Sequence, residues 1–531
     1  MTEGQKTRIA IMDTTLRDGE QTPDIAYTSS EKLHVSRMLL ADVGVDRVEI
    51  ASARVSRGEL EAALRVTDWA RETGMINRVE MLGFCDGQRS VDWILRAGGC
   101  VMNLLAKGSE HHCRTHLQMT PEAHIERIVE TVNHARQNGL QVNIYLEDWS
   151  NGARNSFAYV SKIMDAVQEL DIERVYLADT LGILAPDDAR HFVSVMTVTW
   201  PEARFEFHGH NDYGLATANA IAAIQAGACG VHVSVNGLGE RAGNTSLAEI
   251  VAAISDHTAC TTGVKESSLA VISSLVETFS GKNVSANAPI LGNDVFTQTA
   301  GVHADGDAKG NLYATRLAPQ RFGRERRYAL GKLSGKASLD HNLARLGITL
   351  SDANRQKVLD RIIELGDKKH TVVPEDLLMI IADVLKTPAE QILRIERYAI
   401  HVTSDGSPEA TVVVSFQGKT ANASGTGDGG YDAFMGALKE AVAQYGIQVP
   451  KLIDYRVRIP PGGRTEALVE TRISWGDDAQ DRSFSTLGVD SDQTAAAIIA
   501  TEKMLNIIAH EDALERSISA GAEVSSQSSK I

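Results

Sequence analysis

Short apolar runs recur through the first half of the chain, and each is followed by a segment long enough to form a helix. The runs are Ile9–Asp13, Arg47–Ala51, Val79–Phe84, Val101–Ala106, Val142–Glu147, Arg174–Asp179, Arg204–His210 and Gly230–Asn236. Nearly continuous apolar runs are typical of strands in a parallel sheet, which is buried on both faces. Eight strand–helix units therefore predict an α/β TIM (β/α)8 barrel over residues 1–284. A doubly wound sheet is the alternative, but its Gly-rich fingerprint is missing after the first run.

Polar residues follow the predicted strands at their C-terminal ends, where a TIM barrel carries its active site. These residues are Arg17, Asp18, Glu147, Asp179, Thr180, His208, His210 and Asn236. Such a placement is hard to explain as surface decoration, so we expect a functional site at this end of the barrel.

His208 and His210 have the i, i+2 spacing that points both imidazoles to the same side of a strand. Asp18, at the end of the first strand, would supply a carboxylate. Two histidines and one carboxylate leave open positions on a divalent ion, so that it can bind a substrate. Taken alone, the His-x-His pattern fits two packed or solvated histidines equally well.

The pattern changes after the barrel. Residues 285–327 are rich in Gly, Asn, Asp and Arg and predict a flexible linker or a functional segment that closes the active site. Residues 328–394 predict a helical subdomain, with helix starts at Ser351 and Pro374. Residues 395–512 predict a small α/β domain, and residues 513–531 a disordered Ser-rich tail. The domain's expected strands are Ala399–Thr403, Ala410–Phe416, Leu452–Ile459 and Ala467–Trp475, and its expected helices are Ala433–Tyr445 and Gln493–Ile508.

Charge and cysteine content narrow the class of protein. With 53 basic and 69 acidic residues the formal net charge is -16, which argues against a nucleic-acid or membrane partner. Five cysteines without Cys-x-x-Cys spacing predict reduced thiols in a cytoplasmic protein. The N-terminus does not read as a signal peptide, and no apolar run has the length of a membrane span.

Three motifs together are similar to those of the DRE-TIM metallolyase superfamily, in its branch of isopropylmalate, homocitrate and citramalate synthases. They are Asp13–Gln21, Phe207–Asp212 and Asn236–Thr245, and the similarity extends to about residue 510. Three further runs resemble the citramalate synthases of bacteria: Tyr145–Gly152, Asp294–Gly306 and Gly427–Phe434. The resemblance implies condensation of acetyl-CoA with pyruvate, a regulatory C-terminal domain and a homodimer.

The resemblance also implies a metal site. Asp18, His208 and His210 would be ligands, and Asn244 would lie near or in the fourth protein position. We expect manganese, with cobalt, zinc and magnesium as open alternatives, because such a donor set discriminates weakly between them. Arg17 would bind the 2-oxoacid and stabilise the developing alkoxide; an ordinary salt bridge is the alternative role.

A base must remove a proton from the acetyl group. We expect His303 or Glu147 in this role, with Asp305 and Tyr313 also among the catalytic residues. Asn311 would contact the thioester or CoA. In the synthases that the chain resembles, the segment containing this histidine crosses from the partner subunit, so the active sites would be shared between chains.

The acceptor pocket would be lined by Leu82, Leu105 and Tyr145, whose bulk suits the methyl group of pyruvate. Filling the barrel core is their alternative role. Thr180 would bind the substrate carboxylate or cap the following helix. An isopropylmalate synthase, which takes 2-oxoisovalerate, would need a roomier pocket and remains the main alternative. A lyase running the reverse reaction and a non-catalytic amino-acid sensor are more distant alternatives.

A glycine-rich run, Gly425–Gly430, precedes the first predicted helix of the C-terminal domain. No βαβ unit surrounds it, so we do not expect a dinucleotide site. Its backbone N–H groups suit a small carboxylate instead. By resemblance, isoleucine would bind there, against Tyr431, Leu452, Tyr455 and Ile459.

Overall fold

The computed structural model describes residues 6–346, 348–367, 372, 376–377, 380–381, 384, 393–404, 406–458, 469–477 and 482–509. The chain divides into two compact units. The first comprises Met1–Thr297 with Ala314–Arg326, and the second comprises Gln298–Tyr313 with Arg327–Ile531. The segment expected at 285–327 is thus divided between the two units.

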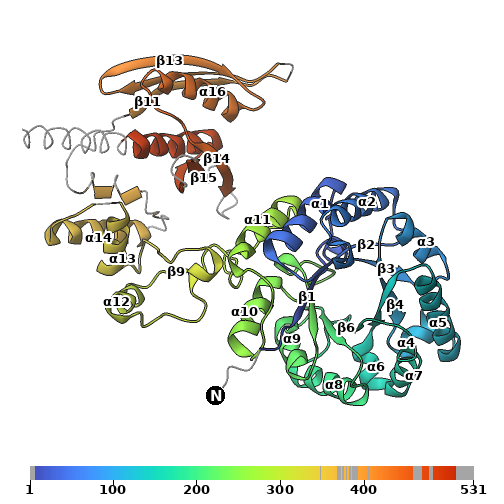
Figure 1. Ribbon diagram of the computed structural model, residues 1–531. Coiled ribbons are helices and arrows are strands. Elements are labelled where there is room, and N and C mark those ends of the chain that lie inside the picture. Colours follow the sequence, from blue (N-terminus) through green and yellow to red (C-terminus); the bar gives the residue numbers. More distant parts are fainter. Residues whose placement is uncertain are drawn as a thin grey trace, which may run out of the picture. The chain divides into compact units, whose positions relative to one another are not determined.

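The first unit is the expected TIM barrel: β1 to β8 are parallel, pair in sequence order and close into a ring with helices around it (Figure 1). The strands are β1 (Ala10–Asp13), β2 (Arg47–Ser52), β3 (Val79–Phe84), β4 (Val101–Lys107), β5 (Gln141–Glu147), β6 (Val175–Asp179), β7 (Phe205–Gly209) and β8 (Gly230–Val233). The eighth strand is shorter than expected. Asn236 lies beyond it in a 3-10 turn, η4 (Val235–Gly237), at a φ of 58°.

Helices cover the outside of the barrel and pack against the strands through a single large hydrophobic core. The helices are α1 (Ser29–Arg37), α2 (Arg57–Glu72), α3 (Arg89–Arg96), α4 (Glu110–Thr115), α5 (Pro121–Gln137), α6 (Trp149–Asn155), α7 (Phe157–Val167), α8 (Pro186–Thr199), α9 (Ala216–Gln225), α10 (Leu247–His257) and α11 (Leu269–Ser280). Their starts follow the usual capping chemistry. Thr28 and Glu31 form a capping box on α1, and Pro121 occupies the first turn of α5 behind the Thr120 cap.

The short turns of the first unit are η1 (Gly19–Gln21), η2 (Met38–Val43), η3 (Ile76–Arg78), η5 (Glu266–Ser268) and η6 (Pro319–Phe322). Two further strands of two residues each, β9 (Thr297–Gln298) and β10 (Arg327–Tyr328), pair with each other. Among the described residues, no helix is both long and apolar enough to cross a membrane.

The second unit begins with a helix where an irregular segment was expected: α12 (Gly301–Gly310) contains the candidate base His303. Gly301 lies against the backbone of Gly335, where a Cβ would come within 2.6 Å of the Gly335 nitrogen, so this contact requires a glycine. The helices α13 (Lys336–Arg345) and α14 (Asp352–Asp367) follow. The predicted start at Ser351 is confirmed, while Pro374 lies outside the described residues.

The C-terminal domain contains two three-stranded antiparallel sheets, ordered β11-β12-β13 and β14-β15-β16. Its elements are β11 (Leu393–His401), β12 (Glu409–Phe416), β13 (Lys419–Thr426), α16 (Gly430–Ala443), β14 (Lys451–Arg458), β15 (Val469–Asp477), β16 (Arg482–Asp490) and a helix over 493–509. Each sheet is followed by a helix, so the domain repeats one β-β-β-α pattern. The sequence prediction missed β13 and β16, whose few large apolar residues conceal the strand pattern.

Candidate metal centre and active site

The turn after β1 carries two of the predicted site residues, Arg17 and Asp18. The backbone N–H groups of Arg17, Asp18 and Gly19 all donate to the carbonyl of Thr14, at 3.1, 2.9 and 3.0 Å. The Thr15 hydroxyl accepts the N–H of Val235 at 2.8 Å. These bonds fix the turn after β1 against the turn after β8, and so place Arg17 and Asp18 at the C-terminal end of the barrel.

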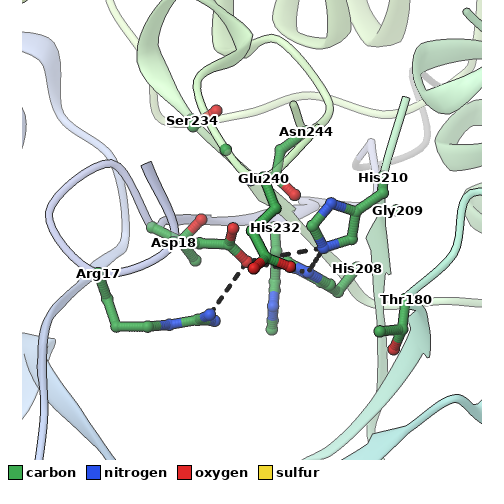
Figure 2. A network of polar contacts seen from close by, with 12 residues as sticks. Arg17, Asp18, Thr180, His208, Gly209, His210, His232, Ser234, Glu240 and Asn244 are labelled. Carbon is green, nitrogen blue, oxygen red and sulfur yellow. Dashed lines mark hydrogen bonds and ion pairs between the residues drawn. The ribbon is translucent and has the colours of Figure 1, made fainter. Parts of the chain in front are cut away.

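Asp18, His208 and His210 converge as the sequence predicted, although His210 lies one residue beyond β7. Their ligand atoms all lie within 4.8 Å of one another. Asp18 Oδ2 is 3.4 Å from His208 Nε2 and 3.8 Å from His210 Nε2, and the two Nε2 atoms are 3.3 Å apart. In the view of Figure 2, Asp18 lies between Arg17 and the two histidines. All three residues are buried.

The donor set fits a divalent cation. Burial lowers the pKa of His210 to about 4, and the neighbouring His208 adds to the shift, so this imidazole is neutral at pH 7. Burial raises the pKa of Asp18, but the Arg17 guanidinium and His208 outweigh it and hold the pKa well below its usual range. Asp18 Oδ1 is buried without a hydrogen-bond partner in the described part of the chain. A carboxylate and two imidazole nitrogens directed at one point are a common set of metal ligands.

Asn244 joins this group through the backbone, because it forms an antiparallel bridge with His210. Its Nδ2 donates to the Leu238 carbonyl at 2.9 Å, and its Oδ1, also buried, has no partner among the residues described. A Cβ on Gly239 would lie 2.3 Å from Asn244 Nδ2 and 3.3 Å from Asp18 Oδ1, so a glycine is required here. The amide group therefore lies near the three candidate ligands, and its role as a fourth ligand stays a prediction.

Arg17 is fixed on three sides. Its Nε donates to Glu49 Oε2 at 2.5 Å, Nη1 to Asp18 Oδ2 at 3.0 Å and Nη2 to the Tyr145 hydroxyl at 3.3 Å. The side chain is 8 % exposed. Burial lowers its pKa, but the Glu49 and Asp18 carboxylates outweigh burial and raise it, so the guanidinium is charged. The two roles considered for Arg17 are compatible, because its salt bridges orient a positive charge beside the candidate metal ligands.

The three residues expected to line the acceptor pocket share one small cluster inside the barrel. Leu82 and Tyr145 are buried in it, and Leu105 packs against it while partly exposed. The Tyr145 ring meets the His208 ring edge-on with centroids 5.7 Å apart. The cluster thus lies beside His208, one of the candidate metal ligands, and Leu82 and Tyr145 also fill the core as their alternative role requires.

Thr180 and Glu147 lie at the ends of β6 and β5 and are already partly engaged. Thr180 Oγ1 accepts the N–H of Asp148 at 2.8 Å, which leaves the hydroxyl proton free of this bond. The helix-capping alternative for Thr180 is wrong, because α8 begins at Pro186 after an Ala185 cap. The Glu147 carboxylate contacts the buried ammonium of Lys107.

Three protein-family models match consecutive parts of the chain. A family model described as HMGL-like matches residues 8–276, a homocitrate synthase post-HMGL domain-like model matches 290–370, and a LeuA allosteric (dimerisation) domain model matches 371–509. The chain belongs to the HMGL-like family. It is an enzyme with a LeuA-type domain at its C-terminus.

Three relatives of this HMGL-like enzyme match it along almost its whole length. A Methanopyrus kandleri protein whose name ascribes (R)-citramalate synthase activity to it is 35% identical over 88% of this chain and 90% of its own length. The (R)-citramalate synthase of Methanocaldococcus jannaschii is 32% identical over 88% of this chain and 92% of its own. A second Methanopyrus kandleri protein, named for 2-isopropylmalate synthase activity, is 32% identical over 94% and 98%. These relatives are archaeal, so they do not support the expected likeness to bacterial enzymes in particular.

The remaining catalytic candidates of this HMGL-like enzyme lie in the second compact unit, on and after α12. The His303 and Tyr313 rings are neighbours, with centroids 4.2 Å apart. Asp305 pairs with Lys309 at 2.7 Å, and Asn311 ends α12 in the left-handed conformation. Their roles toward the metal site stay predictions.

The effector candidates are only partly brought together. The Tyr431 and Tyr455 rings are 5.3 Å apart, whereas Leu452 is 44% exposed and Ile459 lies outside the described residues. The glycine-rich turn also has fewer backbone N–H groups for a carboxylate ligand than expected, because the N–H of Asp428 donates to the Asp432 side chain at 3.1 Å.

Sequence reasoning missed a set of buried polar residues inside the barrel. They are Arg47, Glu49, Glu80, Asn103, Asn143, Tyr176, Glu206 and His232. One feature of the sequence could have identified them: a polar residue that alternates with apolar residues inside a predicted strand. Glu206, two positions before His208, is an example. Such residues point into the barrel, where only another buried polar group can pair with them.

We expect His208→Ala and Asp18→Ala to lower divalent-metal affinity by at least about tenfold, because each removes one of few protein ligands. Isothermal titration with Mn²⁺ would measure the effect. His303→Ala, the control, should bind Mn²⁺ as the unaltered protein does. Loss of metal binding in that variant would contradict the division of roles, and unchanged affinity in the first two would contradict the ligand assignment.

Proposed function

We propose that this enzyme condenses acetyl-CoA with pyruvate and hydrolyses the resulting thioester, giving (R)-citramalate and CoA. The observation that supports the proposal most is the convergence of Asp18, His208 and His210 beside the charged Arg17 at the mouth of the barrel. A 2-oxoacid offers a ketone and a carboxylate on adjacent carbons, and such a site suits both. The names of two relatives point in the same direction.

A divalent cation held by Asp18, His208 and His210, with Asn244 beside them, would supply a positive centre that polarises the ketone. Arg17 directs its charge to the same side and would stabilise negative charge that develops on the ketone oxygen. The Thr180 hydroxyl would donate to the substrate carboxylate. These roles require little rearrangement, because Arg17 is already held by three partners.

The acetyl methyl group must lose a proton before its carbon attacks the ketone carbon. We propose His303 for this step, or Glu147 as the base with His303 assisting it. Lys107 holds the Glu147 carboxylate in place, which suits an orienting role. Asp305, Asn311 and Tyr313 accompany His303 on and after α12, and we propose that they contact the thioester or CoA.

The side chains expected to line the acceptor pocket support pyruvate as the acceptor. Leu82 and Tyr145 are buried, and Leu105 is partly exposed beside them, so the wall near His208 is bulky and apolar. A methyl group needs less room there than an isopropyl group, and the three wall positions carry no basic side chain for the second carboxylate of 2-oxoglutarate. The second candidate, 2-isopropylmalate synthase, is favoured by the name of one relative. A lyase running the reverse reaction has less support, since the reaction would not need the LeuA-type domain.

We expect pyruvate to have a kcat/KM about tenfold or more above those of 2-oxoisovalerate and 2-oxoglutarate, since an apolar pocket discriminates by about this much per excess group. CoA release would be measured with each acid as acceptor. Leu105→Ala should reduce the difference in kcat/KM between pyruvate and 2-oxoisovalerate. Leu104→Ala is the control: Leu104 is fully buried but lies outside the pocket cluster, so the change should lower stability and leave the preference unchanged. A preference for 2-oxoisovalerate would replace this proposal by the second candidate.

We also propose that isoleucine inhibits the enzyme from the C-terminal domain, at a site that includes Tyr431 and Tyr455. The LeuA-type match and the close contact between the two tilted rings support this location. If citramalate leads to isoleucine, that amino acid is the logical effector. Inhibition from a distant site requires that the two activity states differ in effector affinity, by a coupling of about 1 to 3 kcal/mol.

Tyr455→Ala should therefore raise the isoleucine concentration for half inhibition about fivefold or more, with basal activity kept. The assay is CoA release over a range of isoleucine concentrations, with leucine as the comparison effector. Tyr445→Ala is the matched control, because Tyr445 packs on Phe416 at another place in the same domain. Equal potency in Tyr455→Ala and the unaltered enzyme would place the effector site elsewhere.

We further propose a homodimer in which His303 of one chain serves the metal site of the other. Mixing His208→Ala with His303→Ala chains should then restore activity, because a heterodimer has one site with both histidines intact. The measurement is CoA release after subunit exchange, confirmed with two differently tagged chains. No recovery after confirmed exchange would mean that each chain works alone.

A further inference from the structure

His232 lies inside the barrel on β8, fully buried, and is not one of the proposed catalytic or metal-binding residues. Its ring lies beside that of His208, with centroids 5.5 Å apart, and Figure 2 shows the two residues close together. Its two nitrogens face different partners. Nε2 is 3.2 Å from Glu206 Oε2, and Nδ1 is 3.0 Å from the Tyr145 hydroxyl.

Glu206 determines which nitrogen of His232 carries the proton. The Glu206 carboxylate accepts from Arg47 Nη2 at 2.5 and 2.7 Å and is fully buried with it. An ionised carboxylate only accepts hydrogen bonds, so the nitrogen that faces it must be N–H. A neutral imidazole has one N–H, which leaves Nδ1 as an acceptor. The neutral form also follows from the charges nearby: Glu206 is already paired with Arg47 and Arg174, so it would compensate a positive charge on this buried ring poorly.

The Tyr145 hydroxyl has one proton and three polar neighbours. Arg17 Nη2 can only donate to it, so the Tyr145 oxygen accepts that bond. Of the two acceptors, Glu49 is farther away, at 3.4 Å, and both of its oxygens already have donors, Asn103 at 2.7 Å and Arg17 at 2.5 Å. His232 Nδ1 is nearer and is the acceptor that remains.

We propose that His232 is a positioning residue for the condensation: it takes the hydrogen bond of the Tyr145 hydroxyl and thereby turns the Tyr145 oxygen toward Arg17. The proposal rests on the function proposed above. The Tyr145 proton is committed to His232, so Tyr145 cannot donate it to the substrate oxygen, and Arg17 is the group left to stabilise the negative charge there.

Without the acceptor at His232, the Tyr145 proton would turn to Glu49 and compete with Arg17 for that carboxylate. His232→Leu removes both nitrogens at similar size, and we expect kcat to fall about tenfold or more, while the KM for acetyl-CoA changes little. His232→Asn should recover much of the lost kcat, because the amide oxygen of asparagine can accept the Tyr145 hydrogen bond near the position of Nδ1. Recovery by Asn is a result that a purely space-filling role would not give.

A double-mutant cycle tests whether His232 acts through Tyr145. If it does, Tyr145→Phe/His232→Leu should be no more than about twofold worse than Tyr145→Phe alone. Tyr159→Phe is the control partner, since its buried hydroxyl pairs with His124 and the Lys107 carbonyl and not with a neighbour of His232; combined with His232→Leu its effect should be closer to additive. Additive effects in the Tyr145 cycle, or equal kcat in His232→Leu and the unaltered enzyme, would overturn the proposal.

A measurement on the unaltered protein tests the proposal without depending on the folding of a variant or on enzyme activity. ¹⁵N spectra of histidine-labelled protein, with the His232 signals identified by their loss in His232→Asn, report which nitrogen is protonated. Protonated Nε2 with bare Nδ1 supports the proposal, while protonated Nδ1 or a charged ring overturns it. If the enzyme releases no CoA with any 2-oxoacid, the proposed function fails, and the spectra still decide whether His232 orients Tyr145.

Discussion

Each charged side chain inside the barrel is paired with one of opposite charge, because an unpaired ion in such an interior is strongly destabilising. Arg47 meets Glu206 at 2.5 Å and Glu80 at 3.0 Å, although it comes from β2 and they come from β7 and β3. These residues can meet only if the strands close into a ring. The pairing of charges and the closure of the barrel are therefore one constraint, and the orientation of the site follows from it.

The candidate site lies next to these paired charges, at the C-terminal ends of the strands. Glu49 lies two residues after Arg47 on β2 and accepts from Arg17, which in turn donates to Asp18. Glu206 lies two residues before His208 on β7, so the same strand carries one buried carboxylate and one metal-ligand candidate. Because alternate residues of a strand share a face, the interior charges and the site are stacked as successive layers. A disturbance of the lower layer would reach Arg17 through Glu49, and His208 through β7.

Much of this arrangement could be predicted from the sequence, and the rest could not for identifiable reasons. Apolar runs located all eight strands, and the spacing of His208 and His210 identified two metal-ligand candidates, because period and spacing are local properties. Glu49 and His232 were missed because their importance comes from partners on other strands. The strands β13 and β16 were missed because pairing with a neighbour, rather than their own apolar content, stabilises them. The helix at Gly301–Gly310 was missed because three glycines weaken the helical pattern.

Under the proposed function, substrate selection and catalysis would not be independent, because Tyr145 would contribute to both. Its ring belongs to the apolar cluster with Leu82, and its hydroxyl joins Arg17 to His232. A smaller residue at 145 would enlarge the pocket and also remove the hydroxyl contact of Arg17. Leu105 has no polar group and is only partly buried, so a change there alters shape alone. Under the proposed function, position 105 is therefore where acceptor range can change with least effect on the rate of the reaction, whereas position 145 is constrained by the chemistry of its neighbour.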